Sequence, residues 1–107
     1  MQHISAHQLA DWLADGSRPQ PFLLDVREPW EFELAHVAGS RHLPMPSIPE
    51  STAEIPPEGD IVVICHHGVR SLHVAMFLER AGFSAIHNLT GGIDAWASTI
   101  DPAMRRY

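Results

Sequence analysis

A single cysteine is the residue of this sequence best suited to covalent chemistry. Segment 65–71 reads Cys-His-His-Gly-Val-Arg-Ser, so four residues separate the thiol of Cys65 from Arg70, a permanent cation. Gly68 lies between them and allows the backbone to curl, so that several N–H groups can point inward. A loop of this kind favours a thiolate, which is the nucleophilic form of cysteine. The spacing therefore predicts a reactive Cys65, although a lone cysteine can also be only a small buried apolar side chain.

The elements expected around the loop favour a reactive cysteine. Four consecutive β-branched residues, Ile61–Ile64, predict a buried strand that ends directly before Cys65. A helix is predicted from about 71 to 81, and Gly82 ends it. In open α/β sheets ligands bind at the carboxyl ends of the strands, and a helix N-terminus adds the positive end of its dipole. Cys65 is therefore expected where an anion would be stabilised.

The rest of the sequence predicts alternating strands and helices. Further strands are expected at 22–26, 40–43 and 84–88, and further helices at 5–15, 29–34 and from 91 onward. The proline-rich segment 44–59 predicts a loop, which could contain one short turn, and segment 101–107 predicts a turn on the surface. This alternation predicts an α/β fold with a central, mostly parallel sheet of about five strands and helices on both faces. We expect residues 1–107 to form one domain.

Composition restricts the possible partners. The chain has 107 residues and a formal net charge of −6, and its seven cationic side chains are all arginine. An acidic domain without a basic cluster argues against nucleic acid as a partner. The sequence shows neither an apolar run long enough for a bilayer nor a secretory signal at its start. We therefore expect a cytoplasmic protein without a membrane partner.

Neither a cofactor nor a metal ion is expected. A single cysteine excludes an intramolecular disulfide and a thiolate-rich zinc site. His66 and His67 are adjacent, so their rings do not easily converge on one ion, and no Asp, Glu or Cys lies at ligand spacing from them. His3 and His7 are four residues apart, but the first predicted helix begins after His3.

The length of the cysteine loop favours sulfur over phosphate chemistry. Protein-tyrosine and dual-specificity phosphatases place one more residue between their cysteine and arginine, and their wider loop holds a tetrahedral phosphate. The shorter span from Cys65 to Arg70 suits a single sulfur atom on the cysteine better than a phosphoryl group. A phosphatase or an arsenate reductase is therefore the less favoured alternative.

Segment 65–71 resembles the active-site loop of the rhodanese-like sulfurtransferases. Two further segments are similar to signatures of that family. One runs from Leu24 to Pro44 and contains Leu-Asp-Val-Arg, Trp-Glu-Phe and His-Val-Ala-Gly, and the other, Gly91 to Trp96, reads Gly-Gly-Ile-Asp-Ala-Trp. Together the three segments cover nearly the whole chain in the family's order and spacing. The sequence departs from the family at Ala35 and Ser40, where Gly and Ala are common, and in segment 44–59, which is often a helix.

The resemblance implies a thiosulfate or thiol sulfurtransferase. Cys65 would take a sulfane sulfur from thiosulfate or a persulfide donor and pass it, as a cysteine persulfide, to cyanide or a thiol. The substrate-binding residues that it implies are those of the loop: His66, His67, Gly68, Val69, Arg70 and Ser71. Arg70 could bind the donor's sulfonate or pin the loop through an ion pair, since arginine suits both. His66 and His67 could contact the donor, or could face solvent and contribute only their backbone.

A second class of function is kept open. The chain could be a sulfur-carrier or sensor module that docks a partner protein and is loaded by a protein persulfide rather than by thiosulfate. The sequence has no second cysteine to resolve the persulfide, so the acceptor must be external.

Several other residues are interpreted as structural. Asp25, Arg27 and Glu31 are assigned to the scaffold, with Arg27 able to reach Glu31 across one helical turn. The three tryptophans are expected in or near the core: Trp12, Trp30 and Trp96.

Overall fold

The computed structural model describes residues 1–107 and contains a five-stranded sheet in which all neighbouring strands are parallel. The strands are β1 (Gln2–Ile4), β2 (Phe22–Asp25), β3 (Arg41–His42), β4 (Ile61–Ile64) and β5 (Ile86–Leu89), in the order β1-β5-β4-β2-β3. The α-helices are α1 (Ala6–Ala14), α2 (Pro29–Leu34), α3 (Ile48–Ser51), α4 (Val69–Arg80) and α5 (Gly92–Thr99). The α/β fold predicted from the sequence is confirmed.

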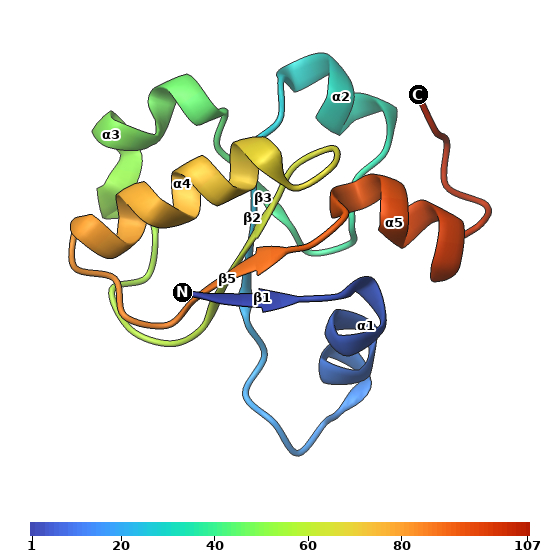
Figure 1. Ribbon diagram of the computed structural model, residues 1–107, viewed down its shortest axis with the longest axis horizontal. Helices are drawn as coiled ribbons and strands as arrows, with labels where there is room; N and C mark the ends of the chain where they lie inside the picture. The colour runs from blue at the N-terminus through green and yellow to red at the C-terminus, as the bar shows by residue number, and fades with distance from the viewer.

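Helices cover both faces of the sheet because its central strand is apolar on both sides. In β4, Ile61 and Val63 belong to one core with α3 and α4, whereas Val62 and Ile64 belong to a second core with α1 and α5. Figure 1 shows α1 and α5 side by side, with α3 and α4 grouped apart from them. The burial of β4 on both faces explains why its sequence is a continuous β-branched run rather than an alternating one.

The segments that follow β2, β4 and β5 meet at one edge of the sheet because all strands run in the same direction. Asp25 at the end of β2 pairs in register with Ile64, and Asn88 near the end of β5 pairs with Val63. Cys65 comes directly after Ile64. This edge therefore brings together residues that are far apart in the chain.

Segment 44–59 is more regular than the predicted loop. It contains two short 3-10 helices, Met45–Ser47 and Thr52–Glu54, on either side of α3. Ile48 and Ile55 are buried in the same core as α4. The prolines conceal these turns in the sequence, because proline suits the first turn of a helix as well as a loop.

The structure corrects the sequence prediction at three further places. The sequence did not indicate β1, a three-residue edge strand whose Gln2 and His3 are exposed. Helix α4 begins at Val69 rather than near 71, so Arg70 lies in its first turn. Trp12 and Trp96 are buried as expected, but Trp30 is 54% exposed and does not belong to the core. No helix of the structure combines the length and the apolar character needed to cross a bilayer.

Candidate active site

The thiol of Cys65 lies inside a tight loop that joins β4 to α4. The backbone N–H of Gly68 donates to its Sγ over 3.0 Å, and Sγ lies 3.2 Å from Oγ of Ser71, to which it donates. Gly68 has φ +107°, and this left-handed conformation turns the chain back toward the sulfur. Cys65 is only 1% exposed. The predicted curled loop around the cysteine is therefore present.

Asn88 ties the loop to β5 and is a residue that sequence reasoning missed. Oγ of Ser71 donates to Oδ1 of Asn88 over 2.5 Å, and Nδ2 of Asn88 donates to the carbonyl oxygen of Gly68 over 3.3 Å. Both side chains are buried. The signal was its position near the end of a predicted strand, because parallel strands end at the same edge as Cys65.

The pair Gly91-Gly92, at the start of α5, packs against the backbone of the cysteine loop. The N–H groups of Ile93 and Asp94, in the first turn of α5, donate to the carbonyl oxygens of Cys65 (2.8 Å) and His66 (3.1 Å). A Cβ on Gly92 would lie 2.5 Å from the Cys65 oxygen and 2.4 Å from the His66 oxygen. Glycine at this position is therefore what lets helix α5 approach the loop backbone.

Arg70 forms a two-pronged ion pair with Glu31 of α2. Its Nη1 and Nη2 donate to the two carboxylate oxygens over 2.7 and 2.8 Å. Glu31 is 2% exposed, whereas about a third of the Arg70 side chain is exposed. Burial opposes ionisation of Glu31, but the hydrogen bonds from Arg70 and Tyr107 outweigh it and lower its pKa to about 2. The ion pair of the loop-pinning role considered for Arg70 is thus present, and the Arg70 side chain stays partly exposed.

Arg27 is fully buried beside this pair and belongs to the scaffold, as expected. Its Nε and Nη2 donate to the carboxylate of Asp25, the shortest distance being 2.7 Å. It reaches only the backbone oxygen of Glu31, over 3.3 Å, and not the Glu31 carboxylate. Burial opposes the charge on Arg27, but Asp25 and Tyr107 more than compensate and raise its pKa.

The two histidines of the loop are not equivalent. The ring of His66 is stacked between His67 (3.9 Å between centroids) and Tyr107 (4.0 Å). Burial and the neighbouring His67 lower the pKa of His66, which favours its neutral form. His67 is exposed.

The structure brings Asp94 of α5 to these histidines, which the sequence argument about ligand spacing overlooked. One donor atom each of His66, His67 and Asp94 lies within 4.8 Å of the others. These are ligand types that zinc accepts. The Asp94 carboxylate, however, accepts from Arg106 over 2.9 Å and lies 3.8 Å from His67. Its charge is thus balanced by groups of the protein, and we assign no metal to this cluster.

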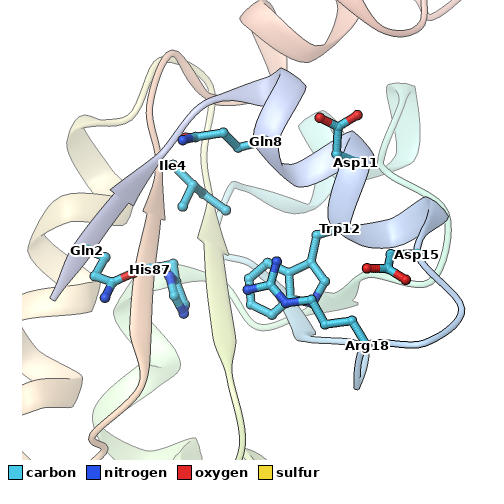
Figure 2. A pocket seen from close by; sticks show the side chains of 8 residues that line it. All are labelled: Gln2, Ile4, Gln8, Asp11, Trp12, Asp15, Arg18 and His87. Atoms are coloured by element: carbon cyan, nitrogen blue, oxygen red, sulfur yellow. The ribbon is translucent and has the colours of Figure 1, made fainter.

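A small cleft lies beside the loop. It has a volume of about 240 Å³, and its lining includes Arg70 from the loop and Val26, which follows β2 next to β4. Other lining residues are Arg27, Glu28, Pro44, Met45 and Pro46. A larger hollow of about 380 Å³, between α1 and the β1–β5 edge, is shown in Figure 2. No residue of the cysteine loop lines that larger hollow, whereas Arg70 lines the small cleft.

The sequence is similar to a known protein family and to several of its members. The family model described as "Rhodanese-like domain" matches residues 5–99. The chain is 36% identical over 78 residues to the thiosulfate sulfurtransferase GlpE of Tolumonas auensis, an alignment that covers 73% of this chain and 74% of that protein. It is 39% identical over 89 residues to the rhodanese-like/PpiC domain-containing protein 12, chloroplastic, of Arabidopsis thaliana. That alignment covers 79% of this chain but only 30% of the longer plant protein.

Solved structures show the same fold. A rhodanese-like domain protein from Staphylococcus aureus superimposes with a TM-score of 0.83 at 27% identity, covering 90% of this chain and 91% of that one. The match of the family model over residues 5–99 includes β2, the cysteine loop and the Gly91-Gly92 turn. The chain therefore belongs to the rhodanese-like domain family.

Proposed function

We propose that this chain is a sulfurtransferase in which Cys65 carries a sulfane sulfur as a persulfide. The observation that carries the proposal is the environment of the Cys65 sulfur, which lies at the carboxyl edge of a parallel sheet and accepts a backbone hydrogen bond from Gly68. The short span from Cys65 to Arg70 suits one more sulfur atom on the cysteine better than a phosphoryl group. The GlpE relatives are named for thiosulfate sulfurtransfer, which supports the same chemistry here.

The proposed reaction has two steps. The Cys65 thiolate attacks the outer sulfur of thiosulfate; a Cys–S bond forms, the sulfur–sulfur bond of the donor breaks, and sulfite leaves with the bonding electron pair. A second nucleophile, cyanide or a thiolate, then attacks the outer sulfur of the persulfide. The Cys65 thiolate leaves and the enzyme returns to its starting state.

The loop supplies the electrostatics of both steps. Gly68 donates its N–H to Sγ, and the first turn of α4 adds the positive end of a helix dipole near the sulfur. Arg70 lines the neighbouring cleft, and its ion pair with Glu31 holds the guanidinium in position. Arg70 is therefore placed to attract the sulfonate of a donor. Of the remaining loop residues, Ser71 contacts the sulfur, whereas the side chains of His67 and Val69 are exposed.

Mass spectrometry of Cys65 after incubation with thiosulfate tests the proposal. We expect the mass of one added sulfur atom on the peptide that contains Cys65, and its loss when cyanide or glutathione is added afterwards. A Cys65 peptide that stays unmodified by thiosulfate and by a persulfide donor would refute the proposal. Cysteine-dependent hydrolysis of an aryl phosphate would instead revive the phosphatase interpretation.

A protein donor or acceptor is the second candidate, and one observation favours it. Two apolar side chains next to the Arg70–Glu31 pair are exposed: Trp30 by 54% and Val69 by 65%. Exposed aromatic and apolar side chains around a reactive group are typical of a docking surface. Slow loading by thiosulfate combined with fast transfer to or from a protein persulfide would select this candidate.

Replacing Arg70 by alanine separates its two roles. We expect the free energy of unfolding to fall by about 2 kcal/mol, because the buried Glu31 carboxylate loses its partner, and the KM for thiosulfate to rise about tenfold. Arg41→Ala is the matched control, since Arg41 forms an ion pair with Glu54 on the surface, and we expect it to change stability by less than about 0.5 kcal/mol. Chemical denaturation and steady-state kinetics measure both effects. An unchanged KM would leave Arg70 with the loop-pinning role alone.

A further inference from the structure

Tyr107 connects two ion pairs at the edge of the sheet, one fully buried and one partly buried. Its hydroxyl donates to Oε2 of Glu31 over 2.6 Å and accepts from Nη1 of Arg27 over 3.0 Å. Arg27 is paired with Asp25, and Glu31 with Arg70. A continuous series of hydrogen bonds therefore runs from the end of β2, through one tyrosine hydroxyl, to the last residues of the cysteine loop.

The ring of Tyr107 is held as well as its hydroxyl. It stacks on His66 with centroids 4.0 Å apart and an interplanar angle of 15°, and it forms a T-shaped pair with Trp30 with centroids 5.2 Å apart. Figure 1 shows the segment after α5 rising beside α2, the helix that carries Glu31. The sequence predicted only a surface turn for this segment.

The Glu31 carboxylate is saturated in this arrangement. Oε1 accepts from Arg70 and from the backbone N–H of Glu28 over 2.9 Å, and Oε2 accepts from Arg70 and Tyr107. Loss of the hydroxyl would leave Oε2 with one donor, in a position that is nearly closed to water. A carboxylate with a missing partner rotates to recover one, and its rotation would move the guanidinium that it holds.

We propose that Tyr107 is a positioning residue, which orients Arg70 toward the donor through the carboxylate of Glu31. This inference rests on the proposed sulfur transfer at Cys65. Tyr107 neither contacts the sulfur nor lines the cleft itself; it contacts Arg27 of the cleft lining and acts on Arg70 through Glu31. The consequence is that binding of an anionic donor depends on a hydroxyl that follows the last helix of the fold.

The phenol itself reports whether Tyr107 is docked, because it is the only tyrosine of the chain. Burial and the hydrogen bond to the Glu31 carboxylate raise its pKa to about 12. At pH 11 we expect roughly a tenth of the phenol to be ionised by ultraviolet absorbance, against roughly nine-tenths for a free tyrosine. Circular dichroism at the same pH shows that the chain is still folded, and NOEs between the Tyr107 and His66 rings at pH 7 give an independent measure. Ordinary ionisation together with missing NOEs would overturn the inference.

Tyr107→Phe tests the positioning role, because it keeps the ring and removes only the hydroxyl. We expect the KM for thiosulfate to rise about tenfold with kcat changed by less than about twofold, and Tyr107→Ala to raise KM at least as much. Thr99→Val is the matched control: it removes an exposed hydroxyl of α5 that donates to the Ala95 oxygen, and its KM stays that of the wild type. A purely structural role would lower the melting temperature of Tyr107→Phe and leave KM unchanged, and that result would overturn the proposal.

A second readout keeps this inference separate from the proposed function. Iodoacetate is an anion and iodoacetamide is neutral, so the ratio of their rates of Cys65 alkylation reports how well Arg70 attracts an anion, whether or not sulfur is transferred. We expect Tyr107→Phe to lower this ratio about threefold to tenfold. If the wild type forms no persulfide, the proposed function fails while this ratio still decides the role of Tyr107. If the ratio is the same in wild type and variant, the positioning role fails.

Discussion

We expect Cys65→Ser to abolish the proposed sulfur transfer, with turnover of thiosulfate falling by at least ~10³-fold. The proposed persulfide requires a sulfur nucleophile, and a serine hydroxyl is not ionised near neutral pH and forms no stable bond of this kind to sulfur. The fold should remain intact, because the serine Oγ occupies less volume than Sγ at a position that already accepts from Gly68 and contacts Ser71. Steady-state assays with thiosulfate and cyanide measure the loss, and thermal unfolding measures the fold.

Ser71→Ala provides the comparison for that experiment. It removes the hydroxyl that links the Cys65 sulfur to Asn88, but it leaves the nucleophile in place. We expect it to reduce turnover only partially. Cys65→Ser could instead keep more than about a hundredth of the wild-type rate, with Ser71→Ala reduced to a similar rate. In that case Cys65 would not be the nucleophile.

The fold could be predicted from the sequence wherever a segment carries its own periodic signal. Three elements are indicated in this way, each without reference to the others. The signals are the β-branched run of β4, the capping box of α1 at Ser5 and Gln8, and the proline at the start of α2. Strand β1 has no such signal. It is a strand only because its backbone adds to the edge of β5, and this is a tertiary contact that a three-residue pattern cannot encode.

The candidate site, like the fold, has one part that the sequence predicts and another part that only the structure shows. The loop from Cys65 to Ser71 is contiguous in the chain, so its residues could be named from their spacing. Glu31, Asn88 and Tyr107 reach the loop from α2, β5 and the segment after α5, and pairings over 17 residues or more leave no trace in local composition. The sequence had suggested Arg27 as the partner of Glu31 because they are four residues apart, and the structure gives that carboxylate to Arg70 instead. Local spacing indicated the candidate nucleophile, and the contacts that support its loop became visible only in the fold.

The surface that could dock a protein donor or acceptor lies on the helix that holds Arg70. The exposed Trp30 is adjacent in sequence to Glu31, so a protein that contacts this side chain would also press on the helix that holds Arg70. A partner bound there and a small donor bound at Arg70 would therefore influence each other through α2. The two candidates for the physiological donor share one set of supporting residues and differ in the surface that delivers the sulfur.

Gly92→Ala destabilises the fold by about 4 kcal/mol, the largest loss of stability that we expect from a single methyl group in this chain. Two effects add. Gly92 has φ +60°, where alanine is strained, and its Cβ would lie 2.4–2.5 Å from backbone atoms of Cys65 and His66. Backbone carbonyls cannot move aside as a flexible side chain would, so the loop must shift. Denaturant titration measures the loss, and the rate of thiosulfate turnover at a temperature where the variant is still folded measures the displacement of Cys65.

Two other glycines distinguish the backbone strain of a left-handed φ from the steric overlap of an added Cβ. Gly39 has φ +83° and nothing within 4 Å of an added Cβ, so Gly39→Ala reports strain alone, about 1 kcal/mol. Gly16 has neither a left-handed φ nor a close neighbour, so Gly16→Ala should be neutral or slightly stabilising. Equal losses at Gly39 and Gly92 would mean that the close approach of α5 to the cysteine loop contributes nothing. A larger loss at Gly92, accompanied by reduced turnover, would show that the Gly91-Gly92 turn supports the loop, and it would give the third family signature a physical role: to let a helix approach the backbone that holds the sulfur.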